Sequence, residues 1–414
     1  MRKGWEIKKL SEIFDVKSSS RVHQSDWKNS GIPFYRAREV VKLARDGFVN
    51  NELYISQELY NEFTKTKGAP KDGDILISAV GTLGQCYLVK KTDKFYFKDA
   101  SVLWLENLGE VNSRFIDYAF KSDLIINQVM EGSMGATVGT LTISRAKEIN
   151  IPLPPLSEQE EIVSILDNAF ESIERAKSNA EQNLKNAKEL FDSYLQNIFE
   201  KGNWIETTLE KLSNKKDAVV SGPFGSNLKV SDYKEKGVPI LRLQNIGKGF
   251  FINKSIKFIT KEKAEELKYH SFKSGDIVLA KLGIPIGKTC IIPESFEDGI
   301  ITADVVRIRP DKNIVYYKFL EYFLNTNISV AQLTGNISGA TRPRVNLSDV
   351  RNIKLKMPKL QEQKDIVDEL DNLTMKINKL EEILNRKINS LDELKKSILQ
   401  KAFNGELKTS KISA

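Results

Sequence analysis

The chain has 414 residues, of which 40% are hydrophobic and 29% are charged, which is typical of a globular protein with two or three domains. It contains no apolar run of about 18 residues, and its first residues lack the apolar core of a secretory signal. Its two cysteines, Cys86 and Cys290, are too few for a disulfide framework or a zinc site. We therefore expect a cytoplasmic protein with no membrane contact.

The net charge of +8 is distributed unevenly along the chain. Residues 156–200 carry ten acidic and four basic side chains, and residues 358–407 carry ten acidic and nine basic ones. The positive charge therefore lies in the rest of the sequence. This pattern predicts that the basic parts contact a polyanion and that the two other stretches contact protein. A generally basic protein without a polyanionic partner is the alternative.

The residues up to 155 predict a β-rich lobe. A strand near Trp5 and Ile7 comes first, and a Gly-x-Pro turn at residues 31–33 begins a second β-rich stretch. Gly73 opens a turn before a short buried strand at residues 75–78. The elements expected after it are a glycine loop, strands at 86–89 and 100–105, a helical stretch at 113–130, a Gly/Ser-rich loop at 132–137 and a strand at 149–154.

The same order of elements recurs about 204 residues later, so the chain is a tandem repeat. The equivalent features are Trp204, the Gly-x-Pro turn at 237–239, the turn at Gly275, strands at 277–280, 289–292 and 303–308, a helical stretch at 314–333, a Gly/Ser-rich loop at 335–341 and a strand at 353–358. A strand-rich lobe followed by a helix, twice over, predicts an α+β fold.

Each repeat ends in a long amphipathic stretch without proline or internal glycine. Its apolar residues recur in steps of four and three, an average of about 3.5 residues, which is the spacing of a left-handed coiled coil. Asn183 and Lys387 interrupt the two series at equivalent positions. The residues expected at the coiled-coil or partner interface are Ile162, Leu166, Ile173, Leu190, Ile366, Leu370, Ile377 and Leu394.

Because the two stretches share spacing and interruption, we predict that they pair with each other in an intramolecular antiparallel coiled coil with pseudo-two-fold symmetry. The alternative is that each packs on its own lobe as an ordinary amphipathic helix. Against it, a helix of this length is about 60 Å long at ~1.5 Å per residue, longer than one lobe is wide. The expected boundaries are a lobe at 1–155, a helix at 156–201, a second lobe at 202–357, a second helix at 358–407 and a tail at 408–414.

Residues 151–162 read IPLPPLSEQEEI, and residues 357–366 read MPKLQEQKDI. Both resemble the PLPPLxEQxxI segment that begins the conserved helices of the specificity subunits of type I restriction-modification enzymes. The run GDILISAVGTLG at residues 73–84 and the Gly-Ala-Thr before each of these segments resemble the target recognition domains of that family. The resemblance extends over nearly the whole chain, in both repeats and in the family's order.

The resemblance implies two target recognition domains, each reading one half of a split sequence in double-stranded DNA, with helical spacers that set the gap. It also implies two modification subunits, which carry the methyltransferase, and restriction subunits that join them. The specificity subunit itself catalyses nothing, and we expect no cofactor and no metal. Repeat two departs from the family pattern at Gly283–Lys288, which is longer than Gly81–Gly84 and lacks its threonine. The two lobes should therefore read different sequences.

Sequence reading in the major groove uses Arg or Lys on guanine and Asn or Gln on adenine. The candidate DNA contacts are Arg36, Arg38, Thr82 and Thr137 in the first lobe, and Arg242, Gln244, Asn245, Lys281, Lys288, Thr341, Arg342 and Arg344 in the second. Arg36 and Arg38 alternate along an expected extended stretch and should share a face. For each single residue, a solvated surface charge or a structural ion pair is an equally good interpretation.

Residues 283–289 end in Gly-Lys-Thr, as phosphate-binding loops do, but the glycine spacing is short and a strand is expected where that motif requires a helix. The only histidines, His23 and His270, lie at no metal-ligand spacing, and no methyltransferase motif is present. The preferred hypothesis is a DNA specificity subunit. The alternative is a coiled-coil interaction scaffold whose basic lobes bind protein or a membrane surface, and a fused enzyme is disfavoured.

Overall fold

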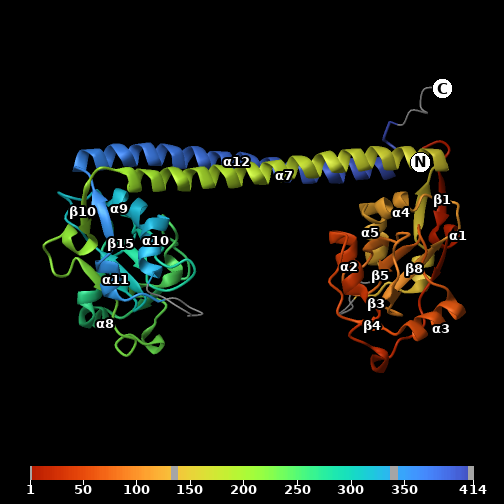
Figure 1. The fold of residues 1–414 in the computed structure, drawn as a ribbon, viewed down its shortest axis with the longest axis horizontal. Coiled ribbons are helices and arrows are strands. Elements are labelled where there is room, and N and C mark those ends of the chain that lie inside the picture. The colour runs from red at the N-terminus through yellow and green to blue at the C-terminus, as the bar shows by residue number, and fades with distance from the viewer. Residues whose placement is uncertain (1, 132–138, 336–343, 409–414) are drawn as a thin grey trace. The chain divides into compact units, whose positions relative to one another are not determined.

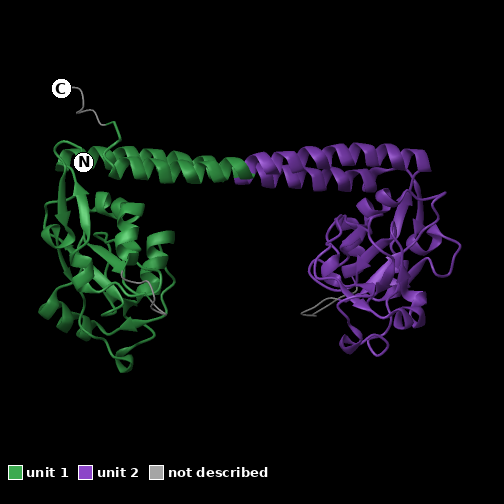
Figure 2. Ribbon diagram, turned by 180° about the vertical axis from the view of Figure 1, so that it is seen from behind, with its two compact units in different colours: residues 1–180, 385–414 green, residues 181–384 purple. Residues whose placement is uncertain are grey.

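The computed structural model describes residues 2–131, 139–335 and 344–408. They form two compact units, residues 1–180 with 385–414 and residues 181–384 (Figure 2). Each unit contains one lobe together with parts of the two long helices α7 (Leu156–Lys201) and α12 (Leu360–Phe403) (Figure 1). Among the described residues, no helix combines the length and the apolar character needed to cross a membrane.

The lobe of unit 1 contains three sheets. The four-stranded sheet has the order β2-β8-β5-β6 and is antiparallel, the three-stranded sheet has the order β4-β3-β7, and β1 pairs with β9. Its elements are β1 (Glu6–Lys9), α1 (Leu10–Ile13), β2 (Phe14–Lys17), η1 (Gln24–Asp26), β3 (Ile32–Tyr35), α2 (Ala37–Asp46), β4 (Tyr54–Ile55), α3 (Gln57–Lys67), β5 (Ile75–Ser78), β6 (Cys86–Leu88), β7 (Tyr96–Phe97), β8 (Val102–Asn107), α4 (Ser113–Phe120), α5 (Asp123–Glu131), α6 (Ile143–Lys147) and β9 (Asn150–Leu153).

The lobe of unit 2 repeats this plan with the sheets β11-β18-β15-β16, β13-β12-β17-β14 and β10-β19. Its elements are β10 (Ile205–Thr208), η2 (Leu209–Leu212), β11 (Val219–Ser221), η3 (Val230–Asp232), β12 (Val238–Leu241), η4 (Leu243–Asn245), β13 (Lys257–Ile259), α8 (Lys261–Glu266), η5 (Lys268–His270), β14 (Ser271–Phe272), β15 (Ile277–Ala280), β16 (Thr289–Ile291), β17 (Gly299–Ile301), β18 (Val305–Ile308), α9 (Tyr317–Leu324), α10 (Asn327–Thr334), α11 (Leu347–Arg351) and β19 (Lys354–Met357). The predicted α+β class of two tandem repeats is confirmed.

The lobes differ most after their second β-rich stretch. In unit 1, β3 leads into the ten-residue helix α2, which ends at Gly47 with φ +75°, whereas in unit 2, β12 leads into the short 3-10 helix η4. The predicted extended conformation holds for Arg36, the N-cap of α2 with φ −99° and ψ 176°, but it is wrong for Arg38, which lies in the first turn of α2. The carboxylate of Glu39 accepts the Arg36 backbone N–H at 3.0 Å, which favours the helical turn.

The long helices run antiparallel where they pair within each unit, as predicted. In unit 1, Lys177 Nζ on α7 lies 2.7 Å from Asp392 Oδ1 on α12, and in unit 2, Lys188 Nζ lies 2.7 Å from Glu381 Oε1. Glu174 also pairs with Lys395 in unit 1, and Tyr194 donates to Glu369 in unit 2. Within each unit the partner numbers on α12 therefore fall as those on α7 rise, which defines an antiparallel pair. Under the 204-residue repeat, Lys177 corresponds to Glu381 and Asp392 to Lys188. The second bridge is thus the first with its charges exchanged.

Two residues expected at the helix interface are not buried there. Leu190 is 72% exposed and Leu394 is 47% exposed, so neither is buried between the two helices. The apolar series continues one residue later than expected, at Phe191, and it is not interrupted at Asn183, because Leu184 takes the next position. By contrast, Ile162, Leu166, Ile173 and Leu370 are buried, and Ile366 and Ile377 are half-buried.

A buried glutamine joins each lobe to the first turn of its long helix. Gln159 accepts a hydrogen bond from the backbone N–H of Asn112 at 2.9 Å and donates one to the carbonyl of Pro154 at 2.8 Å. In unit 2, Gln363 accepts from Tyr316 at 2.8 Å and donates to Pro358 at 2.9 Å. Because both glutamines are at most 1% exposed, these bonds replace water and give the glutamine of the recognised segment a structural role.

Candidate nucleic-acid interface

Arg36 and Arg38, the arginine candidates of unit 1, converge on one buried carboxylate. Arg36 donates to Glu39 through Nε at 3.0 Å and Nη2 at 2.9 Å, and Arg38 donates to Glu39 and to Glu52. Glu39 is only 3% exposed. Although burial favours its neutral form, the bonds from Arg36 and Arg38 outweigh burial and lower the pKa of Glu39. Both arginines thus have a structural ion-pair role in this structure.

Thr82 lies exposed in the loop between β5 and β6. Its carbonyl accepts a hydrogen bond from the Ser78 hydroxyl, and the loop ends at Gly84, whose φ of +74° suits glycine. A side chain added at Gly84 would also meet Val129 at 3.4 Å. The Thr82 side chain is therefore exposed to solvent, on a loop whose backbone is held by the hydrogen bond from Ser78. Thr137 lies outside the described residues.

Asn245 is a structural residue in this structure, and its side chain is not presented for the predicted DNA contact. Its side chain is fully buried, accepts the Arg242 backbone N–H at 3.1 Å and donates to the carbonyls of Ile252 and Lys254, both at 3.1 Å. Its hydrogen-bonding groups are therefore used to close the loop after η4. Gln244 in the same turn is exposed, and with Arg242 it lines a pocket of about 330 Å³.

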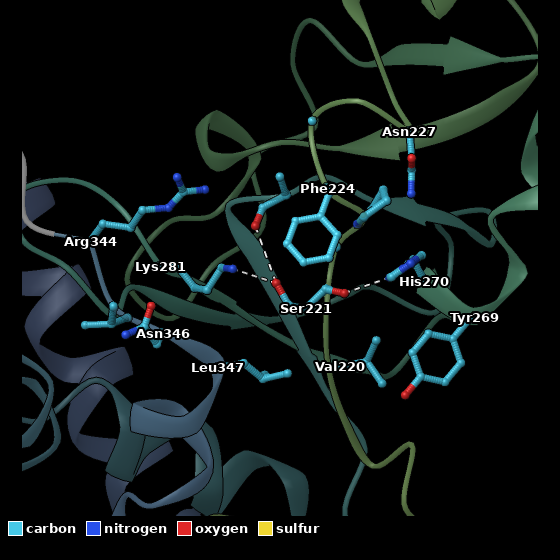
Figure 3. A pocket seen from close by; sticks show the side chains of 15 residues that line it. Val220, Ser221, Phe224, Asn227, Tyr269, His270, Lys281, Arg344, Asn346 and Leu347 are labelled. Carbon is cyan, nitrogen blue, oxygen red and sulfur yellow. Dashed lines mark hydrogen bonds between the residues drawn. The ribbon is translucent and has the colours of Figure 1, made fainter.

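Lys281 and Arg344 line a larger pocket of about 800 Å³ at the end of β15 (Figure 3). Lys281 is 8% exposed, and its Nζ lies 2.6 Å from the Ser221 hydroxyl. Burial, with a contribution from Arg344, lowers the pKa of Lys281. The guanidinium of Arg344 forms an ion pair with Asp304. The two predicted cations therefore lie together, one on the pocket wall and one at its rim.

Lys288, a further candidate in unit 2, is half-buried at the end of the loop that joins β15 to β16, and its carbonyl accepts from Ala280 N–H at 2.9 Å. The loop is followed by the strand β16, as expected, and not by the helix that a phosphate-binding loop needs. Thr341 and Arg342 lie outside the described residues. Within the described ranges, no group of three His, Cys, Asp or Glu residues could hold a metal ion.

The sequence pattern did not single out Ser221 or Phe224, which also line the large pocket, and it placed His270 only among the histidines. Phe224 is 84% exposed and lies in the run Ser-Gly-Pro-Phe-Gly at residues 221–225. An aromatic residue in a Gly/Pro-rich loop was the available signal, because loops of this kind lie at the surface and often carry binding residues. Ser221 has no comparable signal, since its role depends on its distance from Lys281.

The duplicated lobes, the cationic pocket and the long paired helices define a nucleic-acid-binding scaffold as the class of this protein. The family model of the type I restriction modification DNA specificity domain matches residues 2–186 and again residues 188–390. The chain therefore belongs to the family of type I restriction-modification specificity subunits, which are non-catalytic. The family resemblance inferred from the residues is confirmed.

Individual relatives agree with this assignment. The chain is 24% identical over 433 residues to the type I restriction enzyme EcoBI specificity subunit of Escherichia coli, over 97% of this chain and 84% of the relative. It is 26% identical over 422 residues to the MjaVIII specificity subunit of Methanocaldococcus jannaschii, over 99% and 94% of the two chains.

Two solved structures share the fold. One, described as showing complex assembly and conformational transition of the type I R-M system, matches with a TM-score of 0.76 at 19% identity, over 98% of this chain and 99% of that chain. The HsdS subunit from Thermoanaerobacter tengcongensis matches with a TM-score of 0.60 at 18% identity, over 98% of both chains. At these identities the two matches establish the fold.

Proposed function

We propose that each lobe of this chain reads one half of a bipartite target in double-stranded DNA and that the paired helices set the gap between the halves. By its choice of sequence the chain directs adenine methylation by two modification subunits and, with restriction subunits, cleavage of unmodified DNA. The observation that carries this proposal is the duplication, since each compact unit contains one lobe and its own antiparallel stretch of α7 and α12, with the Lys177–Asp392 pair in unit 1 and the Lys188–Glu381 pair in unit 2. Such paired helices can hold two readers at a set separation.

The lobes support DNA contact through different side chains. In unit 2 the proposed contacts are Arg242, Gln244, Lys281, Lys288 and Arg344. In unit 1 they are Thr82 and Arg38, and the side chain of Arg38 is 53% exposed. Arg36 has a smaller part, because its side chain is only 24% exposed and its guanidinium is held by Glu39. Thr137, Thr341 and Arg342 remain proposed contacts from sequence. Because the second β-rich stretch leads into different structures in the two lobes, we propose that the two half-sites differ.

Exposed apolar residues on the long helices provide a docking surface for a modification subunit. In unit 2, Leu190 is 72% exposed, Leu380 is 36% exposed and Ile383 is 52% exposed. The Lys188–Glu381 bridge brings these stretches of α7 and α12 together. Leu394 in unit 1 corresponds to Leu190 under the repeat and is 47% exposed. Exposed patches of large apolar side chains commonly mark protein contacts.

Co-purification tests this surface. Leu190→Glu with Leu394→Glu should weaken retention of the modification subunit, because each substitution places a charge in an apolar contact. Met375→Glu is the matched control, since Met375 is 63% exposed on α12 but lies about 140° around the helix from Leu380 at 3.6 residues per turn. Equal retention by the double variant and the control would contradict this assignment.

A spacer deletion tests the proposed function as a whole. Removing residues 178–184 from α7 and the facing residues 385–391 from α12 keeps the heptad phase and shortens the paired helices by about 10 Å at ~1.5 Å per residue. We expect the gap in the methylated sequence to shorten by about three base pairs, at ~3.4 Å per base pair. The measurement is methylation-site mapping with the modification subunits present. An unchanged gap would refute the proposed spacer mechanism.

Salt dependence separates this function from a scaffold that binds protein or membrane. A DNA reader should bind weakly alone and more tightly with its modification subunit, with affinity that falls steeply as salt rises, because binding releases counterions from phosphates. Gel-shift titrations at several salt concentrations measure this slope. Binding that does not depend on salt, or no binding even with the modification subunit, would favour the scaffold. Membership of the specificity-subunit family argues against that alternative.

A further inference from the structure

Lys281 is a buried cation with no carboxylate of the described residues in an ion pair with it. Among the described residues Lys281 forms no ion pair, and Asp304, the nearby acid, is bound to Arg344. The Lys281 side chain is nonetheless 8% exposed and reaches the pocket that Phe224 and His270 also line (Figure 3). Buried charges in proteins are normally paired. An unpaired ammonium on a pocket wall therefore indicates that an acceptor from another molecule completes the site.

Ser221 holds the ammonium in a defined position. Its hydroxyl donates to the carbonyl of Ala303 at 3.4 Å, so the Lys281 Nζ at 2.6 Å must donate to the same oxygen. This leaves two N–H groups of the ammonium for an acceptor in the pocket. His270 Nδ1 lies 2.7 Å from the carbonyl of Ser221 and fixes the backbone of that residue. The ammonium is thus oriented before any ligand arrives, which favours selectivity.

The pocket offers mainly donors. Arg344 lies at its rim, Asn227 contributes an amide, and no carboxylate is among the described lining residues. The exposed ring of Phe224 adds an apolar surface beside these groups. A guanine edge in the major groove presents two acceptors, O6 and N7, which match the two free N–H groups of the ammonium, whereas thymine presents only one acceptor, cytosine a donor and adenine one of each. The chemistry of the pocket therefore fits guanine.

The ammonium belongs to one lobe only. Strands β15 and β5 end at Ala280 and Ser78, which pair in the same register with the first residues of β18 and β8. Lys281 therefore corresponds to Ala79, a residue without a donor in its side chain. A phosphate contact carries no sequence information and is equally useful in both lobes. A difference between the lobes at this position is what base reading requires.

The cation at the rim also differs between the lobes. Arg344 forms an isolated bridge with Leu282, and Thr140 forms the corresponding bridge with Val80 in unit 1. Thr140 thus stands where Arg344 stands in unit 2. Both cations of the pocket are therefore specific to unit 2, as expected for a site that gives this lobe its own target.

We propose that this pocket receives the O6 and N7 edge of one guanine in the half-site read by unit 2. Lys281 is the specificity-determining residue and donates from Nζ to the guanine acceptors. Ser221 is a positioning residue that acts through Lys281, and Arg344 and Phe224 border the base. This inference rests on the proposed function and names the base that one lobe reads.

Methylation mapping of the Lys281→Ala complex with its modification subunits tests the proposal. One guanine of one half-site should become degenerate, every other position should stay unchanged, and the affinity for the original target should fall about tenfold to a hundredfold. Lys236→Ala, at an exposed lysine in the same lobe, should change no position. Lys281→Met keeps the apolar stem and should reproduce the degeneracy if the alanine variant folds poorly.

Other results of this mapping would overturn the proposal. One is a wild-type target with no guanine in either half-site. The other is a uniform loss of affinity for all sequences with a salt slope lower by about one, which would identify a phosphate contact. A wild-type complex that reads no bipartite target would instead refute the proposed function, so the two failures are distinguishable.

A base analogue tests the contact directly. Replacing the mapped guanine by 7-deazaguanine removes N7, and it should weaken the wild-type complex but leave Lys281→Ala unaffected. Ser221→Ala should lower the preference for guanine, and Ser221→Thr should restore it, because threonine keeps the hydroxyl. Equal sensitivity of wild type and Lys281→Ala to the analogue would contradict a contact between Lys281 and this base.

Discussion

The ring of Phe403, at the C-terminal end of α12, lies 5.0 Å from the ring of Phe115 in α4 of unit 1. The equivalent contact in unit 2 joins Phe199 of α7 to Phe319 of α9 at 5.1 Å. Both helix residues belong to the buried cores of these units. Each lobe is therefore completed by the last turns of the helix that follows the other lobe in sequence, and neither repeat contains a complete core by itself.

Phe403→Ala should destabilise unit 1 by about 3–5 kcal/mol, because it removes a large buried ring and leaves a cavity. Hydrogen exchange should show the loss of protection in the lobe of unit 1, with little change in residues 202–357. Leu190→Ala is the control and should change stability by less than about 0.5 kcal/mol, since that side chain is 72% exposed. Unchanged protection in the first lobe would contradict the shared core.

Gln363→Glu should be more destabilising than Gln363→Ala. The amide nitrogen of Gln363 faces the carbonyls of Pro358 and Ile314, at 2.9 and 2.8 Å, and a carboxylate there would present an acceptor to two acceptors in a buried site. The alanine variant should lose about 1–3 kcal/mol for the unsatisfied groups it leaves. Urea unfolding of both variants measures the difference. A glutamate variant as stable as wild type would show that these bonds do not contribute.

Exchanging the charges of one interhelical bridge should be tolerated. Lys177→Glu alone places like charges near Asp392 and should lower the free energy of unfolding by roughly 0.5–1 kcal/mol, as should Asp392→Lys near Lys177. The double exchange should recover most of the loss, because the Lys188–Glu381 bridge already has the exchanged arrangement in unit 2. A double-mutant cycle measures the coupling. Additive losses would contradict the antiparallel register of this pair.

The stabilisation that Glu39 gives unit 1 should disappear in acid. Its pKa in the folded protein is lowered from an ordinary value of 4.5, so the carboxylate stabilises the fold above that value and loses this effect as the pH falls through the folded pKa. Comparing Glu39→Gln with wild type by urea unfolding should give a clear difference at pH 7 that shrinks below about pH 4.5. A difference that does not depend on pH would contradict the ion pairing with Arg36 and Arg38.

The repeat and the family were readable from the sequence, since both depend on local order. Turns such as the one before Ile75, the strands after them and the helix spacing are determined by neighbouring residues, so their positions were predicted closely. Part of the helix interface was predicted one residue away from its true position. Leu190 is apolar and Asn183 polar, and the pattern alone cannot show that Leu184 is half-buried while Leu190 is exposed.

The candidate DNA contacts were less predictable, because the same type of side chain can either bond to the protein's own backbone or remain exposed for a ligand. Asn245 and Gln244 are neighbours with similar amides, yet one is fully buried in bonds to backbone and the other is exposed. Arg36 and Arg38 were predicted on an extended face, and α2 with its buried Glu39 was not anticipated. The local sequence shows which side chains are hydrogen-bond donors, but it does not show which groups of the folded protein accept their hydrogen bonds.

By itself, the sequence determined the duplication, the α+β class, the long helices and the specificity-subunit family, because repeats, turns and apolar periods are properties of neighbouring residues. Tertiary structure alone decided that Phe403 completes the core around Phe115 and that Lys281 is held by Ser221 in a pocket whose described lining residues include no carboxylate. Contacts of this kind join residues far apart in the chain, and their energies depend on burial and distance, which a linear pattern does not contain.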